Sequence, residues 1–203
     1  GEHILRTLTG VEKDKALRWA ALLHDMGKPA TRTTDEQGID HFHGHAKLGA
    51  EMANGILRRL KFDNDTRKRV VRLVEFHDDR QFPLNHRGVR RAIHRIGADL
   101  FPDYLKLARA DVLAQNPALL PEKLARLSEI GRLYTEILEA QNCLSLKELA
   151  VTGRDLIDAG VKPGPTLGVI LNAMLEAVIE HPEYNTKEYL LERILPVSYT
   201  HLR

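Results

Sequence analysis

The sequence predicts an all-α protein in two parts, a helical bundle over residues 1–144 and a small helical domain over residues 145–196. Apolar residues recur at the three- and four-residue spacing of a helix face through most of the chain. Alternation of Val, Ile and Thr, which is typical of strands, is absent over any useful length. Residues 197–203 show no periodicity, and we expect them to be disordered or foreign to the natural chain.

The helices of the first part follow in order from these signals. The chain opens at residues 1–5 already in helical pattern, which suggests the middle of a longer protein. A polar loop with one proline and two glycines is expected over 28–44. Residues 63–65 are a helix start signal rich in Asp and Asn. The expected helices cover 13–27, 45–61, 64–79, 85–97 and 100–115, and a long helix ends near residue 141.

The length of the expected helices changes after residue 144, where the second part begins. Short helices separated by capping patterns replace the long ones, and Pro165 stands at the first helical position, which favours proline. The expected starts are Ser145–Glu148, Thr152–Asp155, Gly164-Pro165 and Asn185–Glu188, with stops at Gly160 and His181-Pro182.

Composition narrows the classes of function. No apolar run approaches the roughly 20 residues that a membrane span needs. The single cysteine, Cys143, excludes an internal disulfide and favours a reducing compartment, so we expect a cytoplasmic protein without membrane contact. Six of the ten histidines lie before residue 80. We therefore expect any metal site to lie in the first part of the chain.

The stretch that organises this part is His24-Asp25, at the end of a helical apolar stripe. Leu17, Ala20 and Ala21 share a helix face with His24, so its imidazole points toward the core. An imidazole and a carboxylate on adjacent residues can ligate one divalent cation. The alternative is a polar pair that merely caps the helix end.

Further candidate ligands lie on the buried stripes of other expected helices. His3 is on the first helix, His77 follows the apolar positions of the 64–79 helix, and Asp111 shares a face with Leu107 and Ala108. A charged Asp on an apolar stripe is costly unless it is paired or metal-bound. Each residue alone could be a buried polar group satisfied by a neighbour, but together they favour a metal site.

This order of residues resembles the HD superfamily of metal-dependent phosphohydrolases. The resemblance rests on His3, His24-Asp25, the Gly27-Lys28 continuation, and the closing helix Leu107-Ala108-Arg109-Ala110-Asp111. It covers about residues 1–115. It implies a helical bundle that holds one or two divalent metals and hydrolyses phosphate esters.

The whole chain resembles a narrower group, the C-terminal half of bacterial CCA-adding tRNA nucleotidyltransferases and poly(A)-polymerase-like proteins. A nucleotidyltransferase head precedes this half in that family, and its Gly-rich turn with paired aspartates is not in the sequence. Asp63 and Asp65 have the spacing of these paired aspartates, but we interpret the match as chance and the two residues as part of a helix start. We therefore expect no nucleotidyl transfer by this chain, and a head missing from its N-terminal side. The matching segments are Val151–Leu156, Gly160–Pro165 and Asn185–Leu190.

The HD resemblance assigns roles to residues. It predicts His3, His24, Asp25 and Asp111 as ligands of one metal, with Asp25 and Lys28 as catalytic groups. A second metal would use His45, His77 and Asp78, although relatives often have His-His where this chain has His77-Asp78. His41 and His43 are expected to be loop residues. The mixed nitrogen and oxygen ligands suit Ni, Mn, Fe, Co, Zn or Mg.

An arginine-rich segment is the candidate RNA contact. Arg87, Arg90, Arg91 and Arg95 lie on the expected 85–97 helix, where they could neutralise RNA phosphates. The alternative is an ordinary solvated face. The predicted function is hydrolysis of phosphomonoesters or 2′,3′-cyclic phosphates, with tRNA or another RNA as a partner. A non-catalytic RNA-binding module with a structural metal is the alternative.

Overall fold

The computed structural model describes residues 2–115 and 120–196, so the tail predicted over 197–203 lies outside the described residues. The described chain is almost entirely helical, as predicted. None of the described helices is long and apolar enough to cross a membrane.

The chain forms two compact units, which divide it differently from the boundary predicted at residue 144. The first unit contains residues 1–82 and 99–131, and the second contains 83–98 and 132–203. The helix predicted over 85–97 thus joins the C-terminal helices. This grouping arises from contacts between segments that are about 90 residues apart in the sequence. Composition and helix length along the chain do not reveal such contacts.

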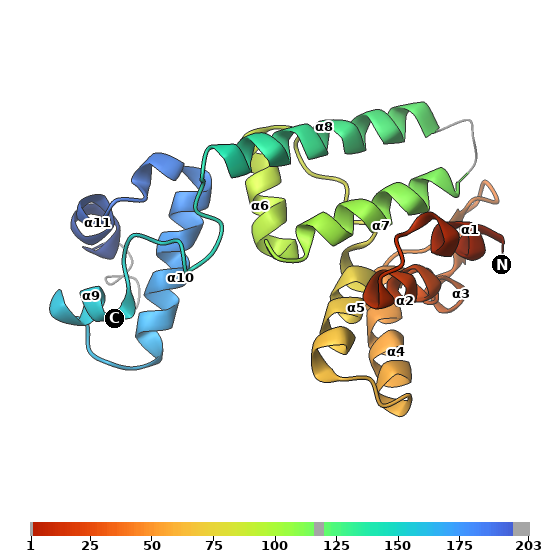
Figure 1. The fold of residues 1–203 in the computed structure, drawn as a ribbon, viewed down its shortest axis with the longest axis horizontal. Helices are drawn as coiled ribbons and strands as arrows, with labels where there is room; N and C mark the ends of the chain where they lie inside the picture. Colours follow the sequence, from red (N-terminus) through yellow and green to blue (C-terminus); the bar gives the residue numbers. More distant parts are fainter. Residues whose placement is uncertain (1, 116–119, 197–203) are drawn as a thin grey trace. The chain divides into compact units, whose positions relative to one another are not determined.

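The first unit is a bundle of antiparallel and crossing helices (Figure 1). Helix α5 packs against α4 and α2, and α1 packs against α7 and α2. Large buried side chains, among them Leu17, Leu57, Leu73 and Leu107, fill the interior. The helices are α1 (Glu2–Gly10), α2 (Lys15–Leu23), α3 (Lys28–Thr31), α4 (His45–Arg59), α5 (Asn64–Phe76), α7 (Phe101–Leu113) and the first part of α8 (Leu120–Glu139).

Two of these helices begin at carboxylate caps and end at histidines. Asp14 accepts a hydrogen bond from the Leu17 amide at 2.8 Å, and Asp63 accepts one from Thr66 at 2.8 Å, as the start signal at 63–65 predicted. Helices α2 and α5 stop before residues 27 and 79, where the sequence predicted their ends. Their C-caps are His24 and His77. The ends of α2 and α5 thereby present imidazoles at the edge of the core.

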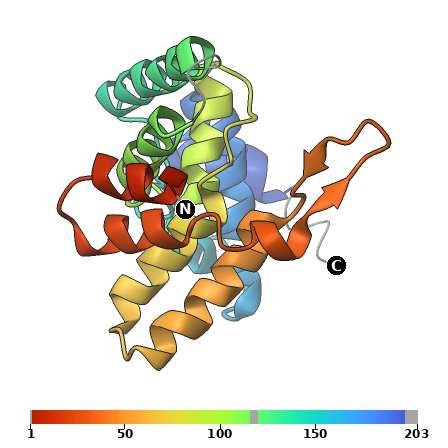
Figure 2. The ribbon, with the colours of Figure 1, turned by 90° about the vertical axis from the view of Figure 1, so that its right-hand side faces the viewer.

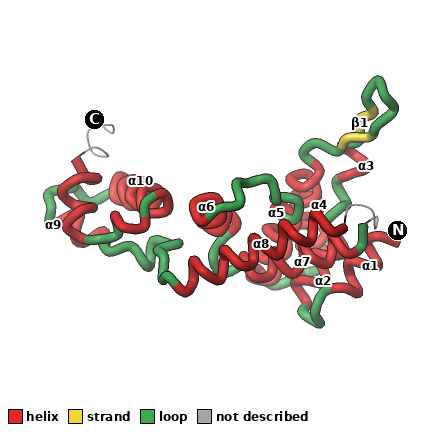
Figure 3. Tube along the Cα trace, turned by 90° about the horizontal axis from the view of Figure 1, so that it is seen from above, coloured by secondary structure: helices red, strands yellow, loops and turns green. Residues whose placement is uncertain are grey.

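The predicted loop over 28–44 contains helix α3 and a small hairpin. Strands β1 (Thr33–Thr34) and β2 (Asp40–His41) are antiparallel, with Thr33 opposite His41. The hairpin projects from the helices of the first unit (Figures 2 and 3). Strands of two residues are too short to show alternation. The turn is held by the Asp35 carboxylate, which accepts hydrogen bonds from the amides of Gln37 and Ile39 at 2.9 Å.

The second unit packs its short helices around an apolar cluster that includes Leu156, Ile170, Met174 and Val178. Its elements are α6 (His86–Ile96), the end of α8, α9 (Gly153–Asp158), α10 (Pro165–Glu180), η2 (Pro182–Tyr184), α11 (Lys187–Tyr189) and η3 (Leu190–Ile194). The helix start predicted at Thr152–Asp155 is confirmed, and the structure shows a capping box between these two residues.

The helix predicted to start at Ser145 is wrong. The Glu148 carboxylate accepts the capping bonds, from the Leu144 amide at 2.9 Å and the Ser145 hydroxyl at 3.0 Å, but the segment remains a turn. Asn185 explains why, because its side chain bonds to the Ala150 amide and the Glu148 carbonyl. Those backbone groups are the ones that a continuing helix would use.

Candidate metal centre

Four side chains from α1, the end of α2 and α7 converge on one point in the first unit. His24 is fully buried at the end of α2, and Asp25 follows it. His3 Nε2 lies 3.2 Å from His24 Nε2, 3.5 Å from Asp25 Oδ2 and 3.0 Å from Asp111 Oδ1. His24 Nε2 lies 3.4 Å from each of the same two carboxylate oxygens. The structure thus brings together all four residues predicted as ligands of the first metal.

A second group meets the other oxygen of Asp25. Asp25 Oδ1 lies 3.6 Å from His77 Nε2 and 4.0 Å from His45 Nε2, and the two Nε2 atoms are 3.2 Å apart. Asp25 therefore belongs to both donor sets, with one oxygen facing each. We call His3, His24, Asp25 and Asp111 the first donor set, and Asp25, His45 and His77 the second donor set.

The opposite nitrogen of each imidazole is tied to a backbone carbonyl. The Nδ1 atoms of His24, His45 and His77 lie 2.7–2.8 Å from the carbonyls three residues earlier, and His3 Nδ1 lies 3.2 Å from the Ala114 carbonyl. A carbonyl only accepts, so each Nδ1 carries a proton and Nε2 is the atom that each ring turns inward. The Nε2 atoms thereby face one another in pairs 3.2 Å apart, His3 with His24 and His45 with His77. A backbone carbonyl that fixes the opposite ring nitrogen in this way is common in metal-ligating histidines.

The electrostatics of the centre agree with a cation site. Burial would raise the pKa of Asp25, but hydrogen bonds to His24 and His77 outweigh it and hold this pKa well below its usual range. Burial likewise opposes ionisation of Asp111, yet its hydrogen bond to His24 and the charge of Arg80 lower its pKa. Both carboxylates are therefore ionised. Their hydrogen bonds raise the pKa of His24 to about 9 against the opposing effect of burial.

Two residues that the sequence did not single out hold Asp111. Arg80 Nη2 lies 3.2 Å from Asp111 Oδ2, and Gln115 donates to the same oxygen at 3.1 Å. These contacts leave Oδ1 facing His3 and His24. Arg80 lies three residues beyond His77, but the sequence contains no signal that its side chain turns toward α7.

A close approach of backbones brings His45 into place. A Cβ atom at Gly27 would lie 2.1 Å from the His45 carbonyl oxygen and 2.9 Å from the Gly49 amide nitrogen. Only a glycine at position 27 therefore lets the first turn of α4 sit against the turn after His24. The Gly-Lys continuation of the motif thus has a packing role here.

Asp78 does not join the second donor set, in contrast to the prediction. It is half exposed, and its carboxylate lies 2.6 Å from Arg80 Nη2. Helix α5 ends at Phe76, and in the turn that follows the Asp78 carboxylate is paired with Arg80 and lies outside the second donor set. Asp25 supplies the carboxylate of the second set instead.

A hollow of about 570 Å³ adjoins the second donor set, with His45 in its lining. Lys28 lies between the centre and this hollow, with Nζ 2.7 Å from Asp25 Oδ2 and 5.8 Å from the centre of the Phe42 ring. His41 and His43 stack on each other and lie outside both donor sets; His43 is in a turn, but His41, predicted as a loop residue, ends strand β2. The lining residues are Lys28, Asp40, His41, Phe42, His43, Gly44, His45, Ala46, Glu75, Asp78 and Asp79.

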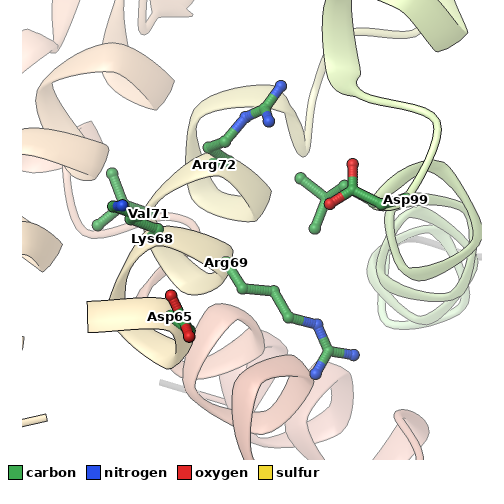
Figure 4. A pocket seen from close by; sticks show the side chains of 7 residues that line it. Asp65, Lys68, Arg69, Val71, Arg72 and Asp99 are labelled. Carbon is green, nitrogen blue, oxygen red and sulfur yellow. The ribbon is translucent and has the colours of Figure 1, made fainter. Parts of the chain in front are cut away.

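Another hollow of about 500 Å³ lies beside α5 in the same unit (Figure 4). Arg69, one of its charged lining residues, is engaged, because it donates hydrogen bonds to Asp103 and Asp14. Arg69 thereby fastens α5 to α7 and to the cap of α2. This hollow contains no histidine and is a weaker candidate for chemistry than the His/Asp centre.

Three of the four arginines predicted to contact RNA have contacts inside the second unit. Arg90 is buried, and its Nε donates to the Ile179 carbonyl at 2.7 Å. Arg87 and Arg91 form ion pairs with Glu180 at the end of α10. Glu180 lies about 90 residues away in the sequence, so charge spacing along α6 could not reveal it. Arg95 also has an interaction partner.

Comparison with known proteins identifies relatives of this chain. Residues 30–194 match the family described as tRNA nucleotidyltransferase domain 2, putative, a span that contains His45, His77 and Asp111. The chain is 36% identical over 175 residues to the A-adding tRNA nucleotidyltransferase of Deinococcus radiodurans, which covers 82% of this chain and 38% of the relative. It is 39% identical over 164 residues to the CC-adding tRNA nucleotidyltransferase of Thermus thermophilus, or 80% of this chain and 36% of the relative.

A shorter match is to the multifunctional CCA protein of Actinobacillus pleuropneumoniae, 33% identical over 76 residues, or 37% of this chain and 18% of the relative. The chain thus spans well under half the length of these relatives. Since the family match extends over most of the sequence, the chain belongs to the tRNA nucleotidyltransferase domain 2 family.

Proposed function

We propose that the chain is a divalent-metal-dependent phosphohydrolase module of a tRNA nucleotidyltransferase-like protein. Its substrates would be phosphomonoesters or 2′,3′-cyclic phosphates, including those at an RNA end. The observation that carries the proposal is the pair of donor sets that share Asp25. Their imidazole nitrogens and ionised carboxylates suit divalent ions of the nitrogen- and oxygen-binding class, and the complete centre would hold two, one in each donor set.

Each protein group has a definite task in this proposal. Divalent ions bound by the two donor sets would polarise a phosphoryl oxygen and acidify a water molecule. Lys28 places a positive charge between the centre and the adjoining hollow, where it can bind a phosphate oxygen. Arg80 and Gln115 hold Asp111 so that only Oδ1 faces His3 and His24.

Membership of a tRNA nucleotidyltransferase family supports tRNA as the partner. The relatives are named for addition of A or of CC to tRNA, and we do not assign that reaction to this chain. A cytoplasmic location, predicted from Cys143, remains a prediction.

The test is turnover after removal and return of metal. Chelated protein should not hydrolyse p-nitrophenyl phosphate or a 2′,3′-cyclic nucleotide, and return of one of the predicted metals should restore hydrolysis. Asp111→Asn should lower the turnover rate by more than about 100-fold. Loss of a residue that only orients a metal ligand typically lowers activity by about 10–100-fold. Asp78→Ala is the control, because Asp78 is acidic and nearby but lies outside both donor sets. Metal-loaded protein that hydrolyses neither ester would favour the alternative, a non-catalytic RNA-binding module with a structural metal.

A further inference from the structure

A basic and aromatic surface lies in the first unit where the turn between α4 and α5 meets the start of α2. Six exposed cations lie within residues 13–18 and 58–61, and the two carboxylates of these stretches and of the turn, Asp14 and Asp63, serve as helix caps. The whole chain has a net charge of only +2, whereas these stretches carry six cations against two carboxylates, and the exposed carboxylates of Glu12 and Asp65 flank them. We call it the turn surface: Lys13, Lys15, Arg18, Arg58, Arg59 and Lys61, with Trp19 and Phe62.

Most of these cations have no ion-pair partner among residues 2–115 and 120–196. Among the residues that the structure describes, only Lys15 of the six forms an ion pair, 3.8 Å from Asp63. This contrasts with Arg87 and Arg91 on α6, which pair with Glu180. The turn surface therefore has cations available to an anionic partner, whereas much of the arginine face of α6 is engaged.

Two aromatic rings lie among the cations. Trp19 and Phe62 are half-buried and meet edge to face, with ring centroids 5.1 Å apart. Lys15 Nζ lies 4.5 Å from the centre of the Phe62 ring. Basic side chains around partly exposed aromatic rings are a combination that binds phosphates and stacks unpaired bases.

Lys61 occupies a backbone position where glycine is favoured. Helix α4 ends in a Schellman motif, in which the Phe62 amide bonds to the Leu57 carbonyl and the Lys61 amide to the Arg58 carbonyl, both at 3.0 Å. Lys61 is the left-handed residue of this motif, with φ of 57°. A lysine there costs conformational energy that glycine would not, and such strain is typical of functional positions.

We propose that the turn surface binds the phosphate backbone of RNA, with Trp19 beside an unpaired base. The inference rests on the RNA partner proposed above but not on hydrolysis, because none of its residues belongs to a donor set. RNA is favoured over a membrane because the exposed side chains are mainly cationic, with Leu60 the one large exposed apolar residue of the turn. It is favoured over a protein because the surface combines unpaired cations with stackable rings.

The single tryptophan gives a direct binding assay with the full chain. Titration with an RNA hairpin that carries a single-stranded 3′ end should change Trp19 fluorescence, and the binding constant should fall steeply with salt. Arg58→Glu/Lys61→Glu should lower the slope of log affinity against log salt by roughly 1.4–1.8, from about 0.7–0.9 per lost phosphate contact. Lys147→Glu/Lys162→Glu makes the same charge change on exposed lysines of the second unit and should leave the slope unchanged.

Lys61→Gly separates binding from folding. It should leave the melting temperature equal or higher, because glycine suits the left-handed backbone, and lower RNA affinity about fivefold at 0.1 M salt. Equal RNA affinity of the two double variants would overturn the proposal, as would absence of RNA binding at low salt. A fluorescence change with phosphatidylglycerol vesicles but not with RNA would overturn it in favour of a membrane surface. Hydrolysis without RNA binding would remove this inference and leave the phosphohydrolase proposal intact.

Discussion

Asp25→Ala is expected to remove both metal ions from the protein. Its two oxygens face different donor sets, Oδ2 toward His3 and His24 and Oδ1 toward His45 and His77. Loss of this one carboxylate should therefore bring the metal content, measured by elemental analysis after dialysis, from two ions per chain to none. Hydrolysis should be lost with it.

Variants confined to one set are the controls. His3→Ala should remove the ion of the first donor set only, and His77→Ala that of the second only. Asp78→Ala should retain both ions, since Asp78 pairs with Arg80. If Asp25→Ala retained one ion, the two sets would be independent and the assignment of Asp25 to both would be wrong.

Gly27→Ala should lose the second metal while retaining the first. The backbone of Gly27 has φ −77° and ψ −18°, which alanine adopts readily, so the effect comes from packing alone. The new methyl group would lie 2.1 Å from the His45 carbonyl oxygen, and this forces the first turn of α4 away from Asp25. Overpacking of this kind costs about 1–3 kcal/mol in the free energy of unfolding.

Gly55→Ala is the matched control on the same helix. No atom lies within 4 Å of a Cβ built at Gly55. This change should retain both metals and stabilise the protein by up to about 1 kcal/mol, the helix-propensity difference between glycine and alanine. Urea unfolding and metal analysis of both variants test the prediction. A Gly27→Ala protein with two bound ions and unchanged stability would contradict the role given to Gly27.

Much of the first donor set could be predicted because its residues interrupt apolar stripes. His24 follows Leu17, Ala20 and Ala21 on one face, and Asp111 follows Leu107 and Ala108 on another. Buried stripes point to a common core, so polar residues on them meet there. The all-α fold follows from the same periodicity.

The rest of the site depends on turn geometry and tertiary contacts that no periodicity encodes. Asp78 adjoins His77 in the sequence, but its carboxylate pairs with Arg80. Arg80 acts through Asp111, and this contact arises only when the turn after α5 packs against α7. Gln115 lies four residues after Asp111, so its contact is local, but the spacing alone does not single it out. The same limit applies to Arg90. The charge pattern of the sequence predicts that Arg90 lies on an RNA-binding face, but the packing of α6 against α10 buries it.

The central claim is a two-metal centre built on a shared Asp25. The most direct measurement is an anomalous-scattering map of crystals loaded with manganese, which counts the bound ions and places them. We predict two peaks about 3.5–4 Å apart, the spacing of two-metal hydrolytic sites. One should contact His3, His24, Asp25 and Asp111, and the other His45, His77 and Asp25. A single peak, or two peaks of which only one contacts Asp25, would contradict the account.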